Sequence, residues 1–187
     1  MRRRGLKVRK VVIQDATFIT ADSGAPESVP RGSTAQTRRS RDGTWTKKGS
    51  KSYFGYKLHV KVDRCFGLIR SIHTTTASVH DSQVDLSLPG EVVYGDRRYF
   101  GAPVKGFDAT MRRGTRGGPV TIFDRLRNIR ISARRAPIER VFAVLKRVFR
   151  AGHMLVTTVP RVKIKNLFSC ICCNLMLMLT LRKKGIV

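Results

Sequence analysis

The sequence predicts a mixed α/β domain, and two patterns carry that prediction. The first is a strict alternation of apolar residues with polar or small ones, whose apolar members are Phe54, Tyr56, Leu58, Val60 and Val62. A period of two indicates a strand with one buried face. The second is apolar spacing of helical period after residue 137, which indicates helices near the end of the chain. Because the 187 residues are 41% hydrophobic, we expect one domain with a core, spanning residues 1–187.

Strands come first along the chain. Residues 6–13 are rich in Val and Ile and predict a strand, with Asp15 at or near its end. Gly, Ser, Pro, Thr and Arg dominate residues 22–52, which predicts a long basic loop. After the alternating strand, a turn at residues 63–67 leads to a second strand at residues 68–74, so these two strands should form a hairpin.

The middle of the chain combines a short strand with loops. Ser78 is a candidate N-cap for a helical segment that Gly90 ends. Residues 91–94 predict a short strand, and Asp96 follows it directly. Residues 101–120 are rich in glycine and basic residues, which predicts a second loop.

Helices are expected in the last third, after a short strand at residues 120–123. Pro137 fits the first turn of a helix that runs to about residue 150, because that turn leaves its N–H groups unbonded. The last helix is expected at residues 165–181. Its apolar run is shorter than the roughly 20 residues that a membrane span needs, so we expect a helix buried in the domain and no membrane partner.

The charge of the chain points to a nucleic acid partner. There are 38 Lys and Arg against 12 Asp and Glu, a net charge of +26. Phosphates neutralise such an excess and release condensed counterions. An anionic membrane is the competing partner, but the sequence shows no long basic amphipathic helix for it. We expect a cytoplasmic protein, because no signal segment follows the basic N-terminus and the four cysteines have neither disulfide nor zinc spacing.

Glu139 is the one acid on a strongly predicted helix. On a helical wheel Arg135, Glu139 and Lys146 fall within roughly 40° of one another, beside an apolar stripe. This position lets Glu139 join a site at the border of the packed face. The alternative stays open: as the third residue of a helix that starts at Pro137, the carboxylate would be stabilised by the helix dipole, and its spacing to Lys146 would suit a solvated charged face.

Four segments together resemble the catalytic domain of insertion-sequence transposases of the DDE class. Residues 11–19 resemble the first strand with its catalytic Asp, and residues 41–63 resemble the basic loop and second strand of the family. Residues 92–101 resemble the strand that leads to the second catalytic Asp. Residues 135–149 resemble the Tyr-Arg-Glu-Lys signature, with Arg, three residues, Glu, six residues and Lys in order.

The resemblance implies a ribonuclease-H-like fold, in which helices flank a mixed sheet. It also implies that Asp15, Asp96 and Glu139 are the catalytic carboxylates and bind two Mg²⁺ ions, for which Mn²⁺ can substitute. The implied reaction is metal-dependent DNA cleavage followed by strand transfer, in which a freed 3′-hydroxyl attacks target DNA. The implied partner is DNA, as transposon ends and as target, bound by a homo-oligomer at the nucleoid.

Two further pairs of residues lie near the implied site. Arg135 and Lys146 of the signature are expected to bind and position phosphates. His80 and Asp81 admit two interpretations, a cluster at a helix start or a supporting role beside the metals.

Other DNA-binding candidates belong to the basic loop and the strand after it. Trp45 lies among lysines and could stack on a base, or it could anchor the loop to the domain. Lys47, Lys48 and Lys57 are the basic candidates of this region.

The chain departs from the family pattern in four places, one of which is a short segment between Asp96 and Glu139. Ser132 stands at the Tyr of the signature, and Arg98 stands where the family has Gly. Members carry a helical DNA-binding region before the first strand, whereas the first strand predicted here begins within ten residues of Met1. We therefore expect a truncated chain that needs a missing N-terminal part or a second polypeptide, and that binds DNA without completing transposition. The alternatives are a decayed, non-catalytic DNA-binding protein and a ribonuclease-H-like nuclease.

Overall fold

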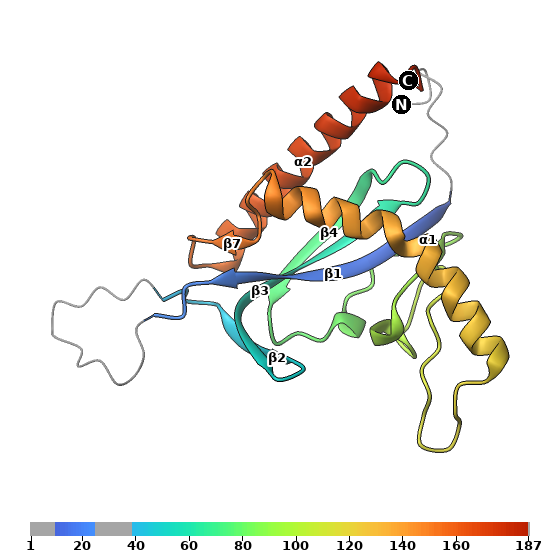
Figure 1. Cartoon of the computed structure of the whole chain (residues 1–187). Helices are drawn as coiled ribbons and strands as arrows, with labels where there is room; N and C mark the ends of the chain where they lie inside the picture. The colour runs from blue at the N-terminus through green and yellow to red at the C-terminus, as the bar shows by residue number, and fades with distance from the viewer. Residues whose placement is uncertain (1–9, 25–38, 187) are drawn as a thin grey trace, which may run out of the picture.

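A mixed β-sheet with two long helices packed on it makes up the part of the chain that the structure, a computed structural model, describes: residues 10–24 and 39–186 (Figure 1). The strands are β1 (Val11–Ala21), β2 (Thr44–Lys48), β3 (Lys51–Asp63), β4 (Ile69–Thr76), β5 (Val92–Tyr94), β6 (Phe107–Asp108) and β7 (His153–Met154). The helices are α1 (Ile122–Arg147) and α2 (Val159–Lys183), and two 3-10 turns are η2 (Asp81–Gln83) and η3 (Arg97–Tyr99). The strand order is β2-β3-β1-β5-β6, with β4 also paired to β3 and β7 to β1. The predicted mixed α/β class is confirmed.

The centre of the sheet is the long antiparallel pair of β1 and β3. β1 continues to Ala21, well beyond the predicted end of the first strand at Ile13. Asp15 therefore lies inside the strand, opposite Val60, and not at its end. The predicted end came too early because polar residues interrupt the apolar run after Ile13, whereas pairing with β3 keeps the backbone extended.

Gly55 lies where β3 passes very close to β1. Its φ is +143°, and a Cβ added to it would overlap the carbonyl oxygen of Ile19. Glycine is the residue that tolerates both this backbone conformation and so close an approach. The close contact gives a physical reason for glycine at this point of the Gly55-Tyr56-Lys57 sequence.

The polar face of β3 is buried as well, so the prediction of one buried face was wrong. Lys57, His59 and Lys61 are 5%, 0% and 2% exposed. The segment between β4 and β5 covers this face, where Lys57 forms an ion pair with Asp81 and Lys61 forms one with Glu91. Alternating polar residues indicated contact with solvent, but ion pairs from another segment compensate them in the interior.

Two other elements differ from those predicted in the first half of the chain. The stretch after Ser78 contains only the short turn η2, whose N-cap is His80. β2 lies inside the predicted basic loop, because its backbone pairs with the start of β3. Residues 25–38 of that loop, and residues 6–9 of the first predicted strand, lie outside the described residues.

α1 begins well before Pro137, which lies inside the helix. Thr121 and Asp124 form a capping box, in which each side chain accepts a hydrogen bond from the backbone N–H of the other residue. The predicted strand at residues 120–123 was therefore wrong. Glu139 now lies far from the helix N-terminus, which removes the helix-dipole explanation for that acid.

α2 packs against β4 and α1. The side-chain amide of Asn174 donates to the carbonyl of Ile69 at 2.8 Å and accepts from the N–H of Ile69 at 2.8 Å. By length and composition α2 could cross a membrane, and only 28% of its apolar window is buried, so the expectation of a helix buried in the domain was wrong, although Asn174 ties one side of the helix to β4. The outward side of α2 exposes large apolar residues, namely Ile164, Phe168, Ile171, Leu175 and Leu179.

Candidate active site

One edge of β1 has a gap between its two short partner strands. β5 pairs with β1 as far as Ile13, opposite Tyr94, and β7 begins to pair at Thr20, opposite His153. Within the described chain no strand pairs with residues 14–19 on this edge, so their backbone is open to another partner. This stretch is called the β1 gap below.

Asp15 lies in the β1 gap as a largely buried carboxylate. Its Oδ2 accepts a hydrogen bond from Nη2 of Arg135 at 2.6 Å, and its Oδ1 accepts one from the backbone N–H of Ala16 at 2.8 Å. Burial raises the pKa of Asp15 to about 6, although the charge of Arg135 lowers it, and the charge of Asp96 raises it further. A nearby cation would stabilise the charged form of a carboxylate whose pKa is raised in this way.

Asp96 lies next to the β1 gap, just after the neighbouring strand β5. It follows β5 and caps η3, where its Oδ1 accepts a hydrogen bond from the backbone N–H of Arg98 at 2.8 Å. β5 runs parallel to β1, so the chain that leaves β5 passes beside Asp15. The two carboxylates are close enough for the charge of Asp96 to disfavour ionisation of Asp15. Such a repelling pair is typical of a cation site.

A third acid, Asp81, lies nearby and forms ion pairs with two cationic side chains. One of its oxygens lies 2.9 Å from Nζ of Lys57, and the other lies 3.2 Å from Nη1 of Arg98. Burial raises the pKa of Asp81, but the hydrogen bonds and charges of Lys57 and Arg98 outweigh burial and hold it below its ordinary value. Burial lowers the pKa of Arg98, yet Asp81, Asp96 and Asp15 together raise it. Arg98 therefore forms an ion pair with Asp81 and also lies near the charges of Asp15 and Asp96.

The hydroxyl of Tyr99 and Nε of Arg135 are buried beside these acids and, like Oδ1 of Asp81, have no hydrogen-bond partner among the described residues. Burial and the charges of Asp15, Asp81 and Asp96 raise the pKa of Tyr99, so its phenol stays neutral and keeps its proton. A hydrated divalent cation would use this arrangement, because it takes hard oxygen ligands and keeps waters that a phenol can contact. The carboxylates of Asp15 and Asp96 thus fit such an ion.

Glu139 does not join the two aspartates in this structure. It is exposed on α1, one turn after Arg135. Across residues 10–24 and 39–186, no three acids, histidines or cysteines form a group that could hold a metal ion. The spacing to Arg135 places Glu139 roughly 6 Å further along the helix axis than the residue that touches Asp15. Asp15 in β1 and Asp96 just after the neighbouring strand β5 therefore lie on one side of the sheet edge without Glu139.

Most of the predicted DNA-binding residues are accessible. Lys48 and Lys146 line a groove along the β1 gap, and Lys47 is exposed on β2. Trp45 is 56% exposed, and its ring lies 5.2 Å from that of Phe54. Trp45 thus combines a contact with the domain and a free surface, and both of its predicted roles stay open.

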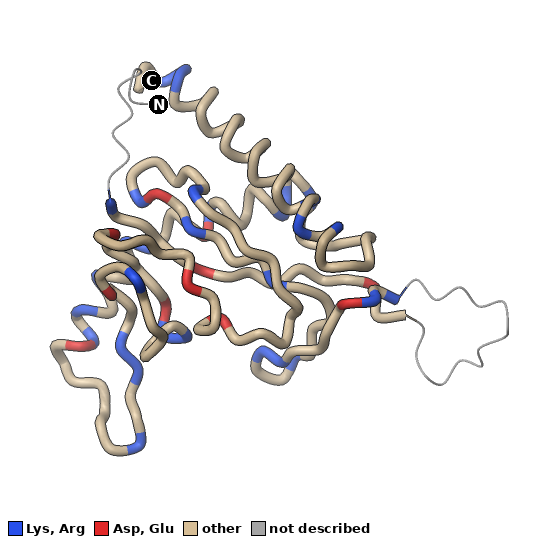
Figure 2. The backbone as a smooth tube through the Cα atoms, turned by 180° about the vertical axis from the view of Figure 1, so that it is seen from behind, with Lys and Arg blue, Asp and Glu red and all other residues tan. Residues whose placement is uncertain are grey.

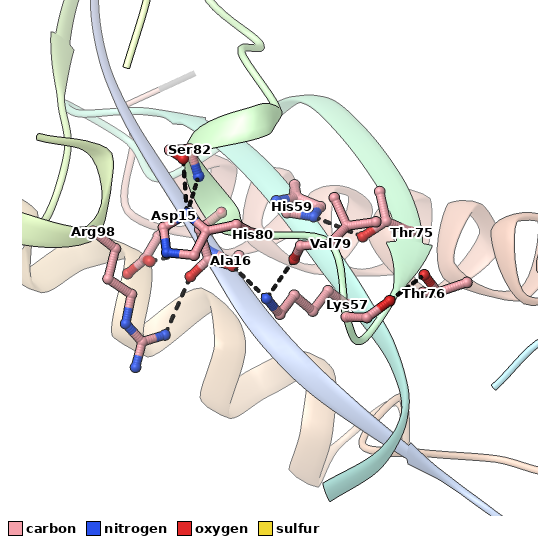
Figure 3. A network of polar contacts seen from close by, with 12 residues as sticks. Asp15, Ala16, Lys57, His59, Thr75, Thr76, Val79, His80, Ser82 and Arg98 are labelled. Carbon is pink, nitrogen blue, oxygen red and sulfur yellow. Dashed lines mark hydrogen bonds and ion pairs between the residues drawn. The ribbon is translucent and has the colours of Figure 1, made fainter. Parts of the chain in front are cut away.

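Lys57 is the exception among these basic candidates, because it is buried. Its Nζ forms the ion pair with Asp81 and donates to the carbonyl oxygen of Val79 at 2.6 Å. The expectation that Lys57 contacts DNA is therefore not supported, and its charge holds Asp81 instead. His80 is the N-cap of η2, and its Nδ1 accepts a hydrogen bond from the N–H of Ser82 at 3.2 Å (Figure 3). This contact agrees with the interpretation of His80 and Asp81 as a cluster at a helix start.

Comparison with known proteins identifies the family of the chain. A family described as the transposase DDE domain matches residues 6–175. The chain belongs to this transposase family. The transposase for insertion sequence element IS1106 of Neisseria meningitidis serogroup B is 28% identical over 194 residues, which cover 92% of this chain and 67% of that relative. No solved structure matches the chain.

The chain is thus the catalytic domain of a DNA transposase of the DDE class, with the mixed sheet and helices of a ribonuclease-H-like fold. Transposases of this family cleave DNA and transfer strands, generally with divalent metals, so DNA is the partner of the family.

Sequence reasoning missed two residues that lie beside the aspartates. Arg98 stood out only as a departure from the family glycine, and Tyr99 had no assigned role. Both follow Asp96 directly, in η3. That proximity was the available signal, but the burial of Tyr99 and the contact of Arg98 with Asp81 depend on the tertiary structure.

Proposed function

We propose that this transposase domain cuts DNA and joins the freed 3′ end to target DNA, with Asp15, Asp96 and Glu139 as its catalytic carboxylates. The observation that carries the proposal is the placement of Asp15 in β1 and of Asp96 just after the neighbouring parallel strand β5, where the charge of Asp96 raises the pKa of Asp15. Holding such a pair costs stability, so a bound cation is the simplest reason to keep it. Two Mg²⁺ ions are the proposed ligands, with Mn²⁺ able to substitute.

Each residue at the site has a separate task in this proposal. Asp15, Asp96 and Glu139 would hold the ions. When bound, the ions would activate a water and stabilise charge on the leaving oxygen. Arg98, held by Asp81, keeps a positive charge beside the reacting phosphate. Because Arg98 is anchored before DNA arrives, this charge requires little reorganisation.

Arg135 has two partners in the proposed cycle. Without DNA its guanidinium compensates Asp15. With Asp15 holding a metal ion, Arg135 would be free to bind a DNA phosphate, for which a planar guanidinium is well suited. Arg135 and Glu139 are separated by one turn, so they lie on the same side of α1. We propose that the release of Arg135 lets this side of α1 approach the aspartates and bring Glu139 into the site.

DNA is held mainly through phosphates in this proposal. Figure 2 shows lysines and arginines on the loops around the sheet and at the C-terminal end of α2. Arg135, Lys146, Lys47, Lys48 and Trp45 are the proposed contacts near the site. Binding measured against salt should show a steep negative log–log slope, because each phosphate contact releases condensed counterions. A flat slope would place the basic residues away from the DNA.

Assembly and end recognition form a separate proposal. Phosphate contacts position a protein on DNA, whereas base contacts supply sequence specificity. We propose that residues 1–187 act as one catalytic domain at the nucleoid in the cytoplasm, and that a further N-terminal part or a second polypeptide recognises the ends. Copies of a chain with a charge of +26 repel each other, so a homo-oligomer should form on DNA and not without it. Mass measurements with and without DNA test this dependence.

Nicking of a plasmid that carries the element's ends, with Mg²⁺ or Mn²⁺, tests the catalytic proposal. The wild-type chain should nick the plasmid, and Asp15→Asn, Asp96→Asn and Glu139→Gln should each abolish nicking. Asp124→Asn is the matched control, because Asp124 caps the far end of α1 and an amide oxygen can still accept the bond from Thr121.

Three outcomes separate this proposal from its alternatives. DNA binding by the wild-type chain without any nicking would favour a non-catalytic remnant. Nicking without strand transfer would favour a nuclease of the same fold. Nicking that survives in Asp15→Asn would reject the proposed carboxylates.

A further inference from the structure

The outward face of α2 carries a continuous apolar stripe, called the α2 stripe below. No charged residue lies between Lys165 and Arg182 in this helix. Seven large apolar side chains of this stretch are 38–64% exposed, namely Ile164, Leu167, Phe168, Ile171, Leu175, Met176 and Leu179. The opposite face packs on the domain through residues such as Val162, Asn166 and Cys173, which are at most 4% exposed. One side of α2 is thus packed, and the other side is apolar and open.

The α2 stripe has the form of a helix-packing surface. Its residues fall into two rows with a spacing of four, Ile164-Phe168-Cys172-Met176 and Leu167-Ile171-Leu175-Leu179. Rows with this spacing form ridges on a helix, and the groove between two ridges accepts a ridge of another helix. Two helices that pack in this way cross at about −50°, which is the commonest class of helix contact in globular proteins.

The α2 stripe is also large enough for a stable contact. The largest apolar patch of a typical monomer covers about 300–600 Å². Seven large side chains that are about half exposed offer on the order of 700 Å², whereas a standard interface takes about 800 Å² from each partner. The stripe could therefore supply nearly all of one side of such an interface.

A second copy of α2 suits the stripe better than the chain's own remaining residues do. Residues 25–38 contain one large apolar residue, Val29, and five of residues 1–9 are basic. A second copy presents the same ridges and grooves, as a contact across a two-fold axis requires. A lipid surface would use the apolar area of the stripe but has no ridges to fit its grooves.

We propose that two copies of the chain form a dimer through their α2 stripes, which cross near Cys172. The proposal rests on the proposed function, in which DNA neutralises the positive charge that keeps the copies apart, and it names the surface through which they meet. At a two-fold axis the residue at the crossing meets its own copy. Cys172 lies in the middle third of its row, and its side chain is smaller than those of the other members, so the two helices can approach closely there.

The test measures the mass of complexes between the full-length chain and a short duplex that carries the element's end and has room for one copy. The wild-type chain should form a complex of two chains and two duplexes. Leu175→Glu should reduce the share of this complex at least about tenfold, because the contact would bury a carboxylate without a partner. Leu175 is 56% exposed, so the variant should fold, and circular dichroism checks this.

Leu155→Glu is the matched control. Leu155 follows β7 and is 78% exposed, away from α2 in the sequence. The substitution makes the same change of charge and side chain as Leu175→Glu. It should leave the complex of two chains and two duplexes unchanged.

The cysteines of the chain test the crossing point. Oxidised glutathione can accept the two electrons and two protons that two Cys172 thiols lose when they form a disulfide. The wild-type complex should therefore give a covalent dimer on a non-reducing gel. Cys172→Ser should abolish this dimer, whereas Cys65→Ser should keep it, because Cys65 is exposed in the turn before β4 and not on α2.

Several results would overturn the proposal. They are a wild-type complex of one chain with one duplex, a two-chain complex that persists in Leu175→Glu, or oxidation that gives no dimer through Cys172. Flotation with phosphatidylglycerol vesicles that Leu175→Glu abolishes, together with one-chain complexes on DNA, would assign the α2 stripe to a membrane surface instead. None of these results bears on the loss of nicking in Asp15→Asn, so the dimer and the catalytic proposal can fail separately.

Discussion

Asp15 and Asp81 are neighbouring acids in the interior of the domain, yet their surroundings shift their pKa values in opposite directions. Asp81 has two cations within 3.2 Å, and its pKa is lowered. Asp15 has one guanidinium and a nearby carboxylate, and its pKa is raised to about 6. The difference indicates that Asp81 is a framework acid, meaning one whose charge the protein itself compensates to stabilise the fold. Asp15 is compensated incompletely, which is expected of an acid that binds a ligand.

The first and largest expected effect is on catalysis. Asp15→Asn should reduce nicking by at least about 10³-fold, because the ions lose a ligand that carries charge. The folded protein should persist, since the variant removes a charge that burial disfavours. Nicking assays and thermal unfolding of the same preparation check both statements. Strong destabilisation of Asp15→Asn would place Asp15 in the framework with Asp81.

The second effect is on stability. Asp81→Asn should destabilise the fold by about 3 kcal/mol at pH 7, because it leaves Lys57 buried without a counter-charge. The lowered pKa of Asp81 means that its contribution is present above pH 3.8 and is lost as the pH falls through its folded value. Urea unfolding of the variant and the wild type measures the difference. A change below about 1 kcal/mol would show that the ion pair is not a framework contact.

The third effect is on the pH dependence of stability, where the two acids should have opposite signs. Since folding raises the pKa of Asp15 from 3.8 to about 6, ionised Asp15 destabilises the metal-free protein. Asp15→Asn should therefore be more stable than the wild type by roughly 2–3 kcal/mol at pH 7. This advantage should shrink as the pH falls through 6 and should vanish below about 3.8. Urea unfolding in a chelator at several pH values measures it, and a constant difference would contradict the raised pKa.

The smallest expected effect concerns Arg135. Its guanidinium donates a hydrogen bond to Oδ2 of Asp15 in the metal-free protein, so it competes with a metal ion for that oxygen. Arg135→Gln should raise the affinity for Mn²⁺ about three- to tenfold, measured by calorimetry without DNA. Lys146→Gln is the matched control, because Lys146 does not contact Asp15. Equal or weaker binding by Arg135→Gln would show that the arginine supports the metal site and does not compete for it.

Local signals in the sequence explain some successes and some failures of prediction. β3, β4 and β5 were predicted because their apolar residues have strand spacing. The start of α1 was missed although Thr121 and Asp124 carry its capping box, because Pro137 gave a second and misleading start signal. β2 was missed because its residues are polar, and its strand conformation depends on pairing with β3.

The sequence by itself determined that this is a basic α/β protein with acids beside its central strands, because composition and spacing along the chain are local properties. Only the tertiary structure decided what each acid does. Asp15 and Arg135 are 120 residues apart in sequence and meet at 2.6 Å, while Lys57 turns inward to Asp81. The pKa of a buried acid depends on the charges packed around it, and those charges come from segments that the local pattern does not connect.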